Sequence, residues 1–372
     1  MQMSKRTAAI LLSRQPLRPS GKTAWVRQSV AAVRWLKSQG LALYSSVGMQ
    51  TWELLTSVAS LEGIKQTLSV PAANDYEFER LKESAIDQFD LNPDLVDFVP
   101  VFSEEKNIAK EEHWLRRDEQ VVEAAAVLLP VSLRKGGHMD SLLQRLRRQG
   151  KSVENRFRVD YEKRVQPLAY RLKAEQLNPK LRQLEDQYLI HWTRSANSAW
   201  PMEKLIDYYK TVIESESYPR SALSTLVNII STKKIVATPK NMPAGIPSVS
   251  FSGLAPADIV PLVKWRSRFR QMSFEPYGIG IEKQYAMGKG VCPVRYYHKN
   301  CDHTHDSERW LWQSVGGKGD WRAEQEYRYK GDFDLSCFPS NRLLALCHTQ
   351  REAEIIEKST GLQTVSLTVK RC

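Results

Sequence analysis

The stretch AAAVLLPVSLRKGGHMDSLLQRLRRQG, residues 124–150, decides the fold of the first part of the chain. Its apolar run at 126–132 has the length of a buried strand, and residues 139–150 repeat apolar side chains at helical spacing before Gly150. Between the two stands a short loop with two adjacent glycines. A strand, a glycine loop and a helix in this order are typical of a parallel α/β sheet.

The same alternation precedes this stretch. Apolar runs predict four more strands, at 7–13, 41–46, 64–71 and 96–102. Helical spacing predicts helices at 23–40, 49–63 and 116–125. Strands that alternate with helices predict a Rossmann-like, doubly wound parallel sheet in a first domain, residues 1–160.

Two loops of this domain are candidates for ligand binding, because ligands of such sheets lie at the carboxyl ends of the strands. The first is SRQPLRPSGK, residues 13–22, and the second is SLRKGG, residues 132–137. Adjacent glycines before a helix let the backbone approach a phosphate, although a plain tight turn has the same pattern. The candidate nucleotide-binding residues are Ser13, Arg14, Arg117, Arg134, Gly136 and Gly137.

This order of elements resembles the Rossmann-like superfamily of lysine-decarboxylase-like nucleotide hydrolases, the DNA-processing protein DprA and nucleotide-sensing SLOG domains. The resemblance covers about residues 6–160. The hydrolase branch carries a PGGxGTxxE pattern whose Glu serves the chemistry, whereas this chain has KGGHMD at 135–140, without that Glu. The resemblance therefore implies that the domain binds or senses a nucleotide, and it does not favour phosphoribohydrolase activity.

Residues 161–188 are charged and are interrupted by Pro167 and Pro179, which predicts a linker or bridging helix. Residues 189–372 mix short strands and helices and predict an α+β domain with a mixed sheet. Three segments of this domain carry polar side chains that suit a site: HWTR at 191–194, SVSFS at 248–252 and DWRAEQEYRY at 320–329.

Glu324 and Glu326 are spaced so that, in one strand, both point to the same face and form a carboxylate pair. Taken singly, each feature has an ordinary structural explanation. Carboxylates on a strand are usually solvated, a lone histidine usually makes a structural hydrogen bond, and three serines on one face suit an edge strand.

In order, these segments resemble the ADP-ribosyltransferase fold and proteins of the abortive-phage-infection type, over about residues 189–335. The resemblance implies NAD as a substrate. It assigns His191 or Arg194 to the NAD phosphates or ribose, and Ser250 with Ser252 to the nicotinamide pocket. It also implies that Glu326 stabilises the sugar cation as the nicotinamide leaves, and that Glu324 orients or deprotonates the acceptor.

Composition sets further expectations. The chain has 372 residues, a net charge of +12 and no apolar run long enough to cross a membrane, so a polyanion is an acceptable partner and a membrane is not. Five cysteines without regular spacing predict a reducing cytoplasm rather than a disulfide framework. The oligomeric state stays open.

Two loops of the second domain have weaker signals. The loop with His298, Cys301, His303 and His305 has several zinc-type ligands but lacks a distant second half-site, so we expect a polar loop and no metal. GGKGD, residues 316–320, suits a substrate-gating loop or an ordinary turn.

Two hypotheses follow. In the first, the chain is a phage-defence or toxin-like effector whose nucleotide- or nucleic-acid-sensing domain controls an NAD-cleaving or ADP-ribosyl-transferring domain with a macromolecular acceptor. In the second, it binds a nucleic acid or signal nucleotide without catalysis, as the charge and the aromatic and basic residues of VRYYHK and EYRYK suggest.

Overall fold

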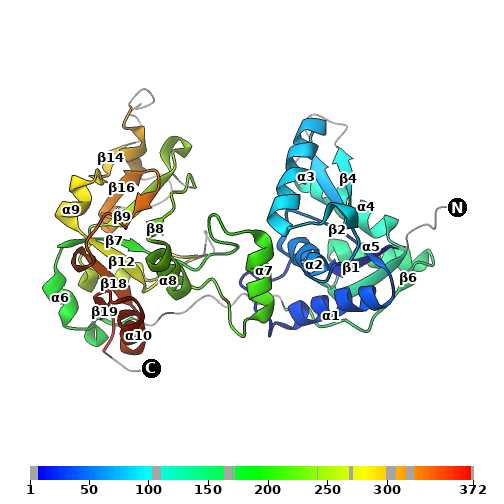
Figure 1. Cartoon of the computed structure of the whole chain (residues 1–372), viewed down its shortest axis with the longest axis horizontal. Coiled ribbons are helices and arrows are strands. Elements are labelled where there is room, and N and C mark those ends of the chain that lie inside the picture. Colours follow the sequence, from blue (N-terminus) through cyan, green and yellow to red (C-terminus); the bar gives the residue numbers. More distant parts are fainter. Residues whose placement is uncertain are drawn as a thin grey trace. The chain divides into compact units, whose positions relative to one another are not determined.

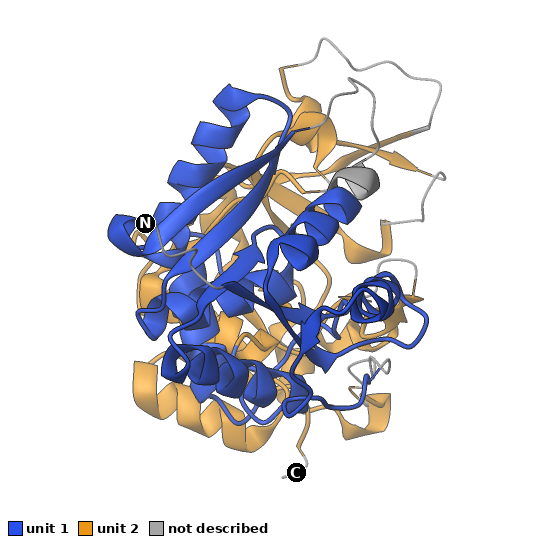
Figure 2. Ribbon diagram, turned by 90° about the vertical axis from the view of Figure 1, so that its right-hand side faces the viewer, with its two compact units in different colours: residues 1–165, 197–219 blue, residues 166–196, 220–372 orange. Residues whose placement is uncertain are grey.

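The computed structural model describes residues 7–102, 110–162, 170, 172–240, 242–267, 271–298, 307–315 and 322–369. The chain divides into two compact units. The first unit contains residues 1–165 and 197–219, and the second contains residues 166–196 and 220–372 (Figure 2). Residues 197–219 belong to the first compact unit, although they lie within the range 189–372 that the sequence assigns to the second domain.

The first unit is a Rossmann-like α/β fold, as the sequence predicts (Figure 1). Its sheet has the strand order β4-β3-β2-β1-β5-β6, and every pair of neighbours is parallel. The strands are β1 (Thr7–Leu12), β2 (Ala42–Ser46), β3 (Gln66–Ala72), β4 (Val96–Phe102), β5 (Val127–Ser132) and β6 (Ser152–Val153). The helices are α1 (Ala24–Ser38), α2 (Gln50–Leu61), α3 (Asp75–Phe89), α4 (Lys110–Ala124), α5 (His138–Arg148) and, from the later segment, α7 (Leu205–Glu214).

Strands β1 and β5, in the middle of this sheet, are almost entirely apolar because both of their faces are covered. In β1, five of six residues are buried, and β5 has the same pattern. Helices α1 and α2 contact each other, as do α4 and α5, which follows the two helical layers of a doubly wound fold.

Helix α3 has no counterpart among the predicted elements. Its residues Phe78, Leu81, Ala85 and Phe89 recur at helical spacing, so the pattern of an amphipathic helix is present in the sequence although only Ala85 and Phe89 are buried. The Asn74 side chain starts the helix by accepting a hydrogen bond from the Glu77 amide.

The second unit is an α+β domain built on a mixed sheet, again as predicted. The seven-stranded sheet has the order β13-β16-β9-β7-β12-β18-β19, and only its last pair is parallel. Its strands are β7 (Tyr188–Trp192), β9 (Ser248–Ser252), β12 (Gly278–Glu282), β13 (Cys292–Pro293), β16 (Glu326–Lys330), β18 (Leu343–Cys347) and β19 (Thr364–Ser366).

Two-stranded sheets and short helices complete this unit. The small strands are β8 (Lys234–Ile235) with β17 (Phe333–Asp334), β10 (Trp265–Arg266) with β11 (Gln271–Met272), and β14 (Arg295–His298) with β15 (Trp312–Val315). The helices are α6 (Lys180–Leu184), α8 (Ala222–Thr232), α9 (Lys283–Gly288) and α10 (Gln350–Thr360). The five-residue α6 is the only α-helix among the described residues of 161–188, so the bridging helix of the linker hypothesis is not seen there.

The two faces of the seven-stranded sheet pack in separate clusters. Leu189, Phe251 and Ile279 lie in one apolar cluster, whereas Ile190 and Trp192 lie in another. Because neighbouring residues of a strand point to opposite faces, this assignment fixes the face of every side chain on β7 and β9. No helix in the described part of the chain is long and apolar enough to cross a membrane.

Candidate functional site

The two ligand loops predicted in the first unit meet at the carboxyl edge of its sheet. Strands β1 and β5 are neighbours, and the chain order diverges on either side of them, so their ends form the switch point where ligands of such sheets bind. Ser13 Oγ accepts a hydrogen bond of 2.9 Å from the Arg134 amide. Gln15 Nε2 donates to the carbonyl oxygens of Ser13 and Ser132, both at 3.0 Å. These bonds tie the loop after β1 to the loop after β5.

The glycine loop itself is a tight turn that ends in α5. Gly136 has a φ of 69°, which favours glycine, and its amide donates to Asp140 Oδ2 at 2.9 Å. Gly137 is the N-cap of α5 and donates to the Arg134 carbonyl at 2.9 Å. The Asp140 carboxylate thus accepts a hydrogen bond from one backbone amide of the loop. The exposed side chains of Arg14, Arg134 and Lys135 add positive charge to the two loops.

Arg117 lies elsewhere in this unit. Its side chain is 1% exposed and donates to Asp118 at 2.7 and 3.0 Å and to the Val47 carbonyl at 3.2 Å. Trp52 Nε1 also donates to Asp118, at 3.2 Å. Arg117 therefore holds the loop between β2 and α2, and the structure does not join it to the glycine loop.

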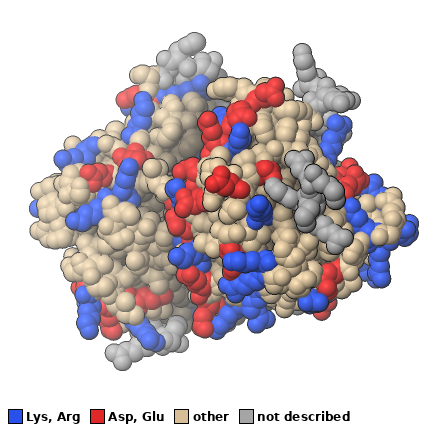
Figure 3. Space-filling view, turned by 45° about the vertical axis from the view of Figure 1, so that its right-hand side comes forward, with Lys and Arg blue, Asp and Glu red and all other residues tan. Residues whose placement is uncertain are grey.

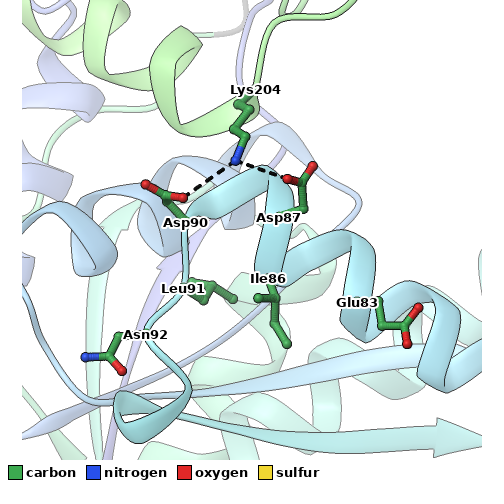
Figure 4. Close-up of a pocket in the computed structure, with 7 residues that line it drawn as sticks. All are labelled: Glu83, Ile86, Asp87, Asp90, Leu91, Asn92 and Lys204. Atoms are coloured by element: carbon green, nitrogen blue, oxygen red, sulfur yellow. Dashed lines mark ion pairs between the residues drawn. The ribbon is translucent and has the colours of Figure 1, made fainter.

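An open pocket in the first unit lies near neither loop. It has a volume of about 460 Å³ and is lined by the C-terminal part of α3, by the three residues that follow this helix and by Lys204 (Figure 4). Lys204 reaches its rim and forms ion pairs with Asp87 at 3.0 Å and Asp90 at 3.6 Å. These pairs attach the segment before α7 to α3.

In the second unit, three adjacent strands carry the residues that the sequence selects. In the order β16-β9-β7, they hold Glu326, then Ser250 and Ser252, then His191. The antiparallel register pairs Glu326 with Ser252 and Arg328 with Ser250, and paired residues share a face. The serines and Glu326 therefore lie on one face of the sheet.

The Glu326 carboxylate is held by an ion pair and a serine. Ser250 Oγ donates to Oε1 at 2.8 Å, and Arg328 donates through Nε to Oε1 at 2.8 Å and through Nη2 to Oε2 at 2.9 Å. Arg328 is 2% exposed and also donates to the Trp310 carbonyl and to Gln313 Oε1, each at 2.8 Å. Arg328 was not among the predicted site residues, although its spacing of two from Glu326 places it on the same face.

Glu324 does not continue the strand of Glu326, so the predicted same-face pair within one strand is wrong. Glu324 ends a short 3₁₀ helix (Arg322–Glu324), and Gln325 has a φ of 46°, which turns the chain before β16 begins. Ser252 Oγ donates to the Glu324 carbonyl at 2.6 Å. The Glu324 carboxylate nevertheless stays close enough to Glu326 for the two charges to interact.

Burial, together with the neighbouring Glu326 charge, raises the pKa of Glu324, while Arg266 opposes the shift. Among the described residues, the structure records one hydrogen-bond donor for this carboxylate, Arg266 Nη2, at 3.2 Å from Oε1. Arg194 and Lys264 add positive charge nearby. Glu324 is thus the less saturated of the two carboxylates, as a proton acceptor requires.

The sequence left His191 and Arg194 as alternatives, and the structure separates them. Ile190 pairs with Ser252, so the next residue, His191, lies on the opposite face, where its ring meets Phe251 at 6.0 Å. Its Nδ1 lies 2.9 Å from the Ser250 carbonyl. Burial lowers the pKa of His191 to about 4, although the Ser250 carbonyl opposes the shift, so the ring is neutral near pH 7.

Arg194 follows β7 and lies within electrostatic range of Glu324, Glu275 and Arg266. Glu275 is 1% exposed and accepts hydrogen bonds from the Ser195 amide and Ser195 Oγ, both at 2.8 Å, and from the Tyr170 hydroxyl at 2.9 Å. Glu275 therefore fixes the turn after Arg194. No short motif marks Glu275 in the sequence.

The two weaker loop predictions lie outside the described residues. Cys301, His303 and His305 and residues 316–320 are not described, nor is the side chain of His298. Within the described part of the chain, no group of three or more His, Cys, Asp or Glu side chains could hold a metal ion.

Comparisons with known proteins add little to this geometry. No protein-family profile matches the chain, and no curated protein matches its sequence. Among solved structures, it is similar to DNA processing protein A (DprA) from Streptococcus pneumoniae, with 12% identity, a TM-score of 0.30 and 40% of this chain against 48% of that chain. DNA processing protein A from Helicobacter pylori, described for its single-stranded DNA binding, has 14% identity, a TM-score of 0.30 and coverages of 40% and 64%. The chain thus spans about half to two thirds of the length of these structures.

Proposed function

We propose that the second unit cleaves NAD and transfers ADP-ribose to water or to an acceptor. The observation that carries this proposal is the hydrogen bond from Ser250 Oγ to Glu326 Oε1 across adjacent strands, with Arg194 at the end of the next strand. A carboxylate oriented by a serine suits a positively charged ribose, and a guanidinium within electrostatic range of the neighbouring Glu324 suits the pyrophosphate attached to that ribose.

The reaction assigns a separate task to each carboxylate. The bond between the ribose C1′ and the nicotinamide nitrogen breaks, and nicotinamide leaves with the electron pair. Glu326 stabilises the positive charge that develops on the ribose. An oxygen of water or of an acceptor hydroxyl then bonds to C1′ and gives its proton to Glu324, whose raised pKa suits a base at neutral pH.

Released nicotinamide tests this proposal directly. We expect wild-type protein to release nicotinamide from NAD, and Glu326→Gln and Ser250→Ala to do so at least about 100-fold more slowly. Glu354→Gln on α10 is the matched control, because Glu354 is exposed and its recorded partner within the described part of the chain is the neighbouring Gln350. If all four folded proteins behave alike, the site is not an NAD site.

For the first unit, we propose that the loops 13–22 and 132–137 bind a phosphate-bearing nucleotide that controls the second unit. The support is the switch-point position of Ser13 and Arg134, with exposed cations around a glycine turn before a helix. In this scheme, nicotinamide release rises or falls when the nucleotide is added. In cells, expression of wild-type protein depletes NAD and Glu326→Gln does not.

A second candidate function is nucleic-acid binding without catalysis, favoured by basic side chains at one edge of the first sheet. Arg147 and Arg148 are exposed in the last turn of α5, and Arg158 is exposed after β6. Acidic and basic side chains are mixed on the face of the molecule shown in Figure 3, so the +12 charge does not by itself define a binding face there. Binding of single-stranded DNA that weakens steeply between about 50 and 200 mM salt, and that Arg147→Ser/Arg148→Ser reduces, supports this function.

A further inference from the structure

The chain of the second unit makes an excursion into the first unit. It leaves after Ala196, and residues 197–219, here called the arm, pack with the first unit before the chain returns at Arg220. Three arm side chains, Tyr208, Tyr209 and Val212, belong to the main apolar core of that unit and are almost completely buried. The arm, which contains α7, is therefore an integral part of the Rossmann-like fold (Figure 1).

The arm contacts the loop after β1 near both of its own ends. Arg18 Nε donates to Asn197 Oδ1 at 3.1 Å, and the Gly21 amide donates to the Ser215 carbonyl at 2.8 Å. A Cβ at Gly21 would overlap the carbonyl oxygen of Ile213. The loop and the arm thus meet backbone to backbone, and only glycine fits at the contact.

Two side-chain contacts fasten the middle of the arm. Tyr209 donates a hydrogen bond of 2.8 Å to Glu53 Oε2, in the first turn of α2. Lys204 forms the ion pairs with Asp87 and Asp90 at the C-terminal end of α3. The arm is therefore held along its length by the unit that carries the candidate nucleotide loops.

At the second unit, the arm begins within three residues of Arg194. Ser195 is fixed by two hydrogen bonds to Glu275, and the Ala196 amide donates to the Arg220 carbonyl at 2.9 Å, which closes the neck of the arm. Two residues span at most about 7 Å, so there is little slack between Ser195 and Asn197. Asn197 is thus joined to the neck by a single peptide bond.

We propose that the arm couples the loop after β1 to the Arg194 end of β7, so that a ligand bound at this loop changes how Arg194 is held. This coupling regulates the proposed NAD site. It rests on the proposed function only because that function makes Arg194 a contact of the substrate. The path is continuous: the loop bonds the arm, the arm is covalently joined to Ser195, and Ser195 is bonded to Glu275. The loop after β1 lies at one end of this path and the Arg194 end of β7 at the other, and both act on the arm. Coupling between two sites requires such a shared element.

Amide hydrogen exchange on the full chain tests the coupling without a ligand or NAD. Gly21→Ala introduces the overlap with Ile213, and Gly21 has no left-handed φ that alanine would resist. We expect exchange of the Ser195 and Ala196 amides to accelerate about fivefold or more, with β1 and β5 still protected. Gly288→Ala is the control, because a Cβ there meets open space and an ordinary φ.

The result that overturns the proposal is unchanged exchange at Ser195 and Ala196 in Gly21→Ala, whether or not the arm amides are released. If Gly21→Ala removes protection throughout the first unit, Tyr209→Phe decides instead, because it deletes one arm hydrogen bond and keeps the ring. Exchange does not depend on catalysis. Absent nicotinamide release therefore counts against the NAD function alone, and unchanged exchange counts against the coupling alone.

Discussion

Ser250 Oγ donates a hydrogen bond of 2.8 Å to Glu326 Oε1, from one strand of the second sheet to its neighbour. The two residues are separated by 76 positions in the chain. The pairing of Arg328 with Ser250 places the Glu326 and Ser250 side chains on one face, where Arg328 completes the carboxylate's hydrogen bonds. These contacts distinguish the region from a solvated strand face, because a buried guanidinium and a serine hydroxyl both donate hydrogen bonds to the same carboxylate.

Arg328→Met should destabilise the second unit strongly. The substitution leaves the Glu326 carboxylate, which is mostly shielded from water, without its ion-pair partner, and breaking a buried pair from one side costs about 3–5 kcal/mol. Glu326→Gln/Arg328→Met should cost less than the two single changes added together, because neither charge is then left alone. Urea unfolding followed by tryptophan fluorescence measures both values. Arg351→Met, at an exposed position of α10, should change the unfolding free energy by less than about 0.5 kcal/mol; equal effects at 328 and 351 would contradict the assignment.

The sequence predicted those parts of the fold that local pattern determines. Strands β1 and β5 are almost entirely apolar because they are covered on both faces, and their lengths follow from the apolar runs. Helix α3 was missed although its apolar residues recur at helical spacing, and α7 lies within the residues expected to form the second domain but packs in the core of the first unit. Periodicity tells which face of a helix is apolar, but not which unit that face joins.

The same limit applies to the candidate site. The sequence selected Ser250, Ser252, Glu324 and Glu326, which the structure brings together, but the turn at Gln325 depends on a backbone conformation that no side-chain pattern reports. The choice between His191 and Arg194 required the register of β7 on β9, which is a long-range property. Glu275 could not be found because its partners, Ser195 and Tyr170, are distant in the chain.

His191 should remain neutral and should be dispensable for NAD cleavage. Its pKa of about 4 means that its ring proton resonances should not titrate between about pH 5.5 and pH 8 in NMR spectra. Since a histidine with a lowered folded pKa opposes folding as it protonates, the stability that it contributes is lost as the pH falls from about 6.5 towards 4. We expect His191→Phe to retain most nicotinamide release and Arg194→Gln to lose it. A titration near pH 6.5, or equal losses in the two variants, would reverse the assignment of the two residues.

Ser13→Ala should weaken nucleotide binding without unfolding the first unit. It removes the oxygen that accepts a hydrogen bond from the Arg134 amide and so loosens the link between the two loops. One hydrogen bond of about 1 kcal/mol corresponds to a loss of about fivefold in affinity. Calorimetric titration with ADP checks this value, with Ser141→Ala on the exposed side of α5 as the control. If both variants bind ADP as wild type does, the switch point is not the nucleotide site.

Tyr209→Phe should destabilise the first unit in a way that grows with pH. Burial raises the pKa of Glu53, and the hydrogen bond from Tyr209 opposes that shift. Without the hydroxyl, the folded pKa of Glu53 rises further above its unfolded value. A carboxyl group of this kind favours folding below its unfolded pKa, and this contribution is lost as the pH rises through the folded pKa. We therefore expect a cost of about 1–3 kcal/mol near pH 7 that shrinks towards pH 4, where Glu53 is protonated in both proteins.

Thermal unfolding across this range measures the trend. Tyr44→Phe is the matched control in the same unit, because the recorded partners of the Tyr44 hydroxyl are uncharged: Ser69 Oγ at 3.3 Å and Gln120 Nε2 at 3.4 Å. Its effect should not depend on pH, and in Glu53→Gln/Tyr209→Phe the pH dependence should disappear. A cost in Tyr209→Phe that stays constant from pH 4 to pH 8 would mean that the hydroxyl contributes packing alone.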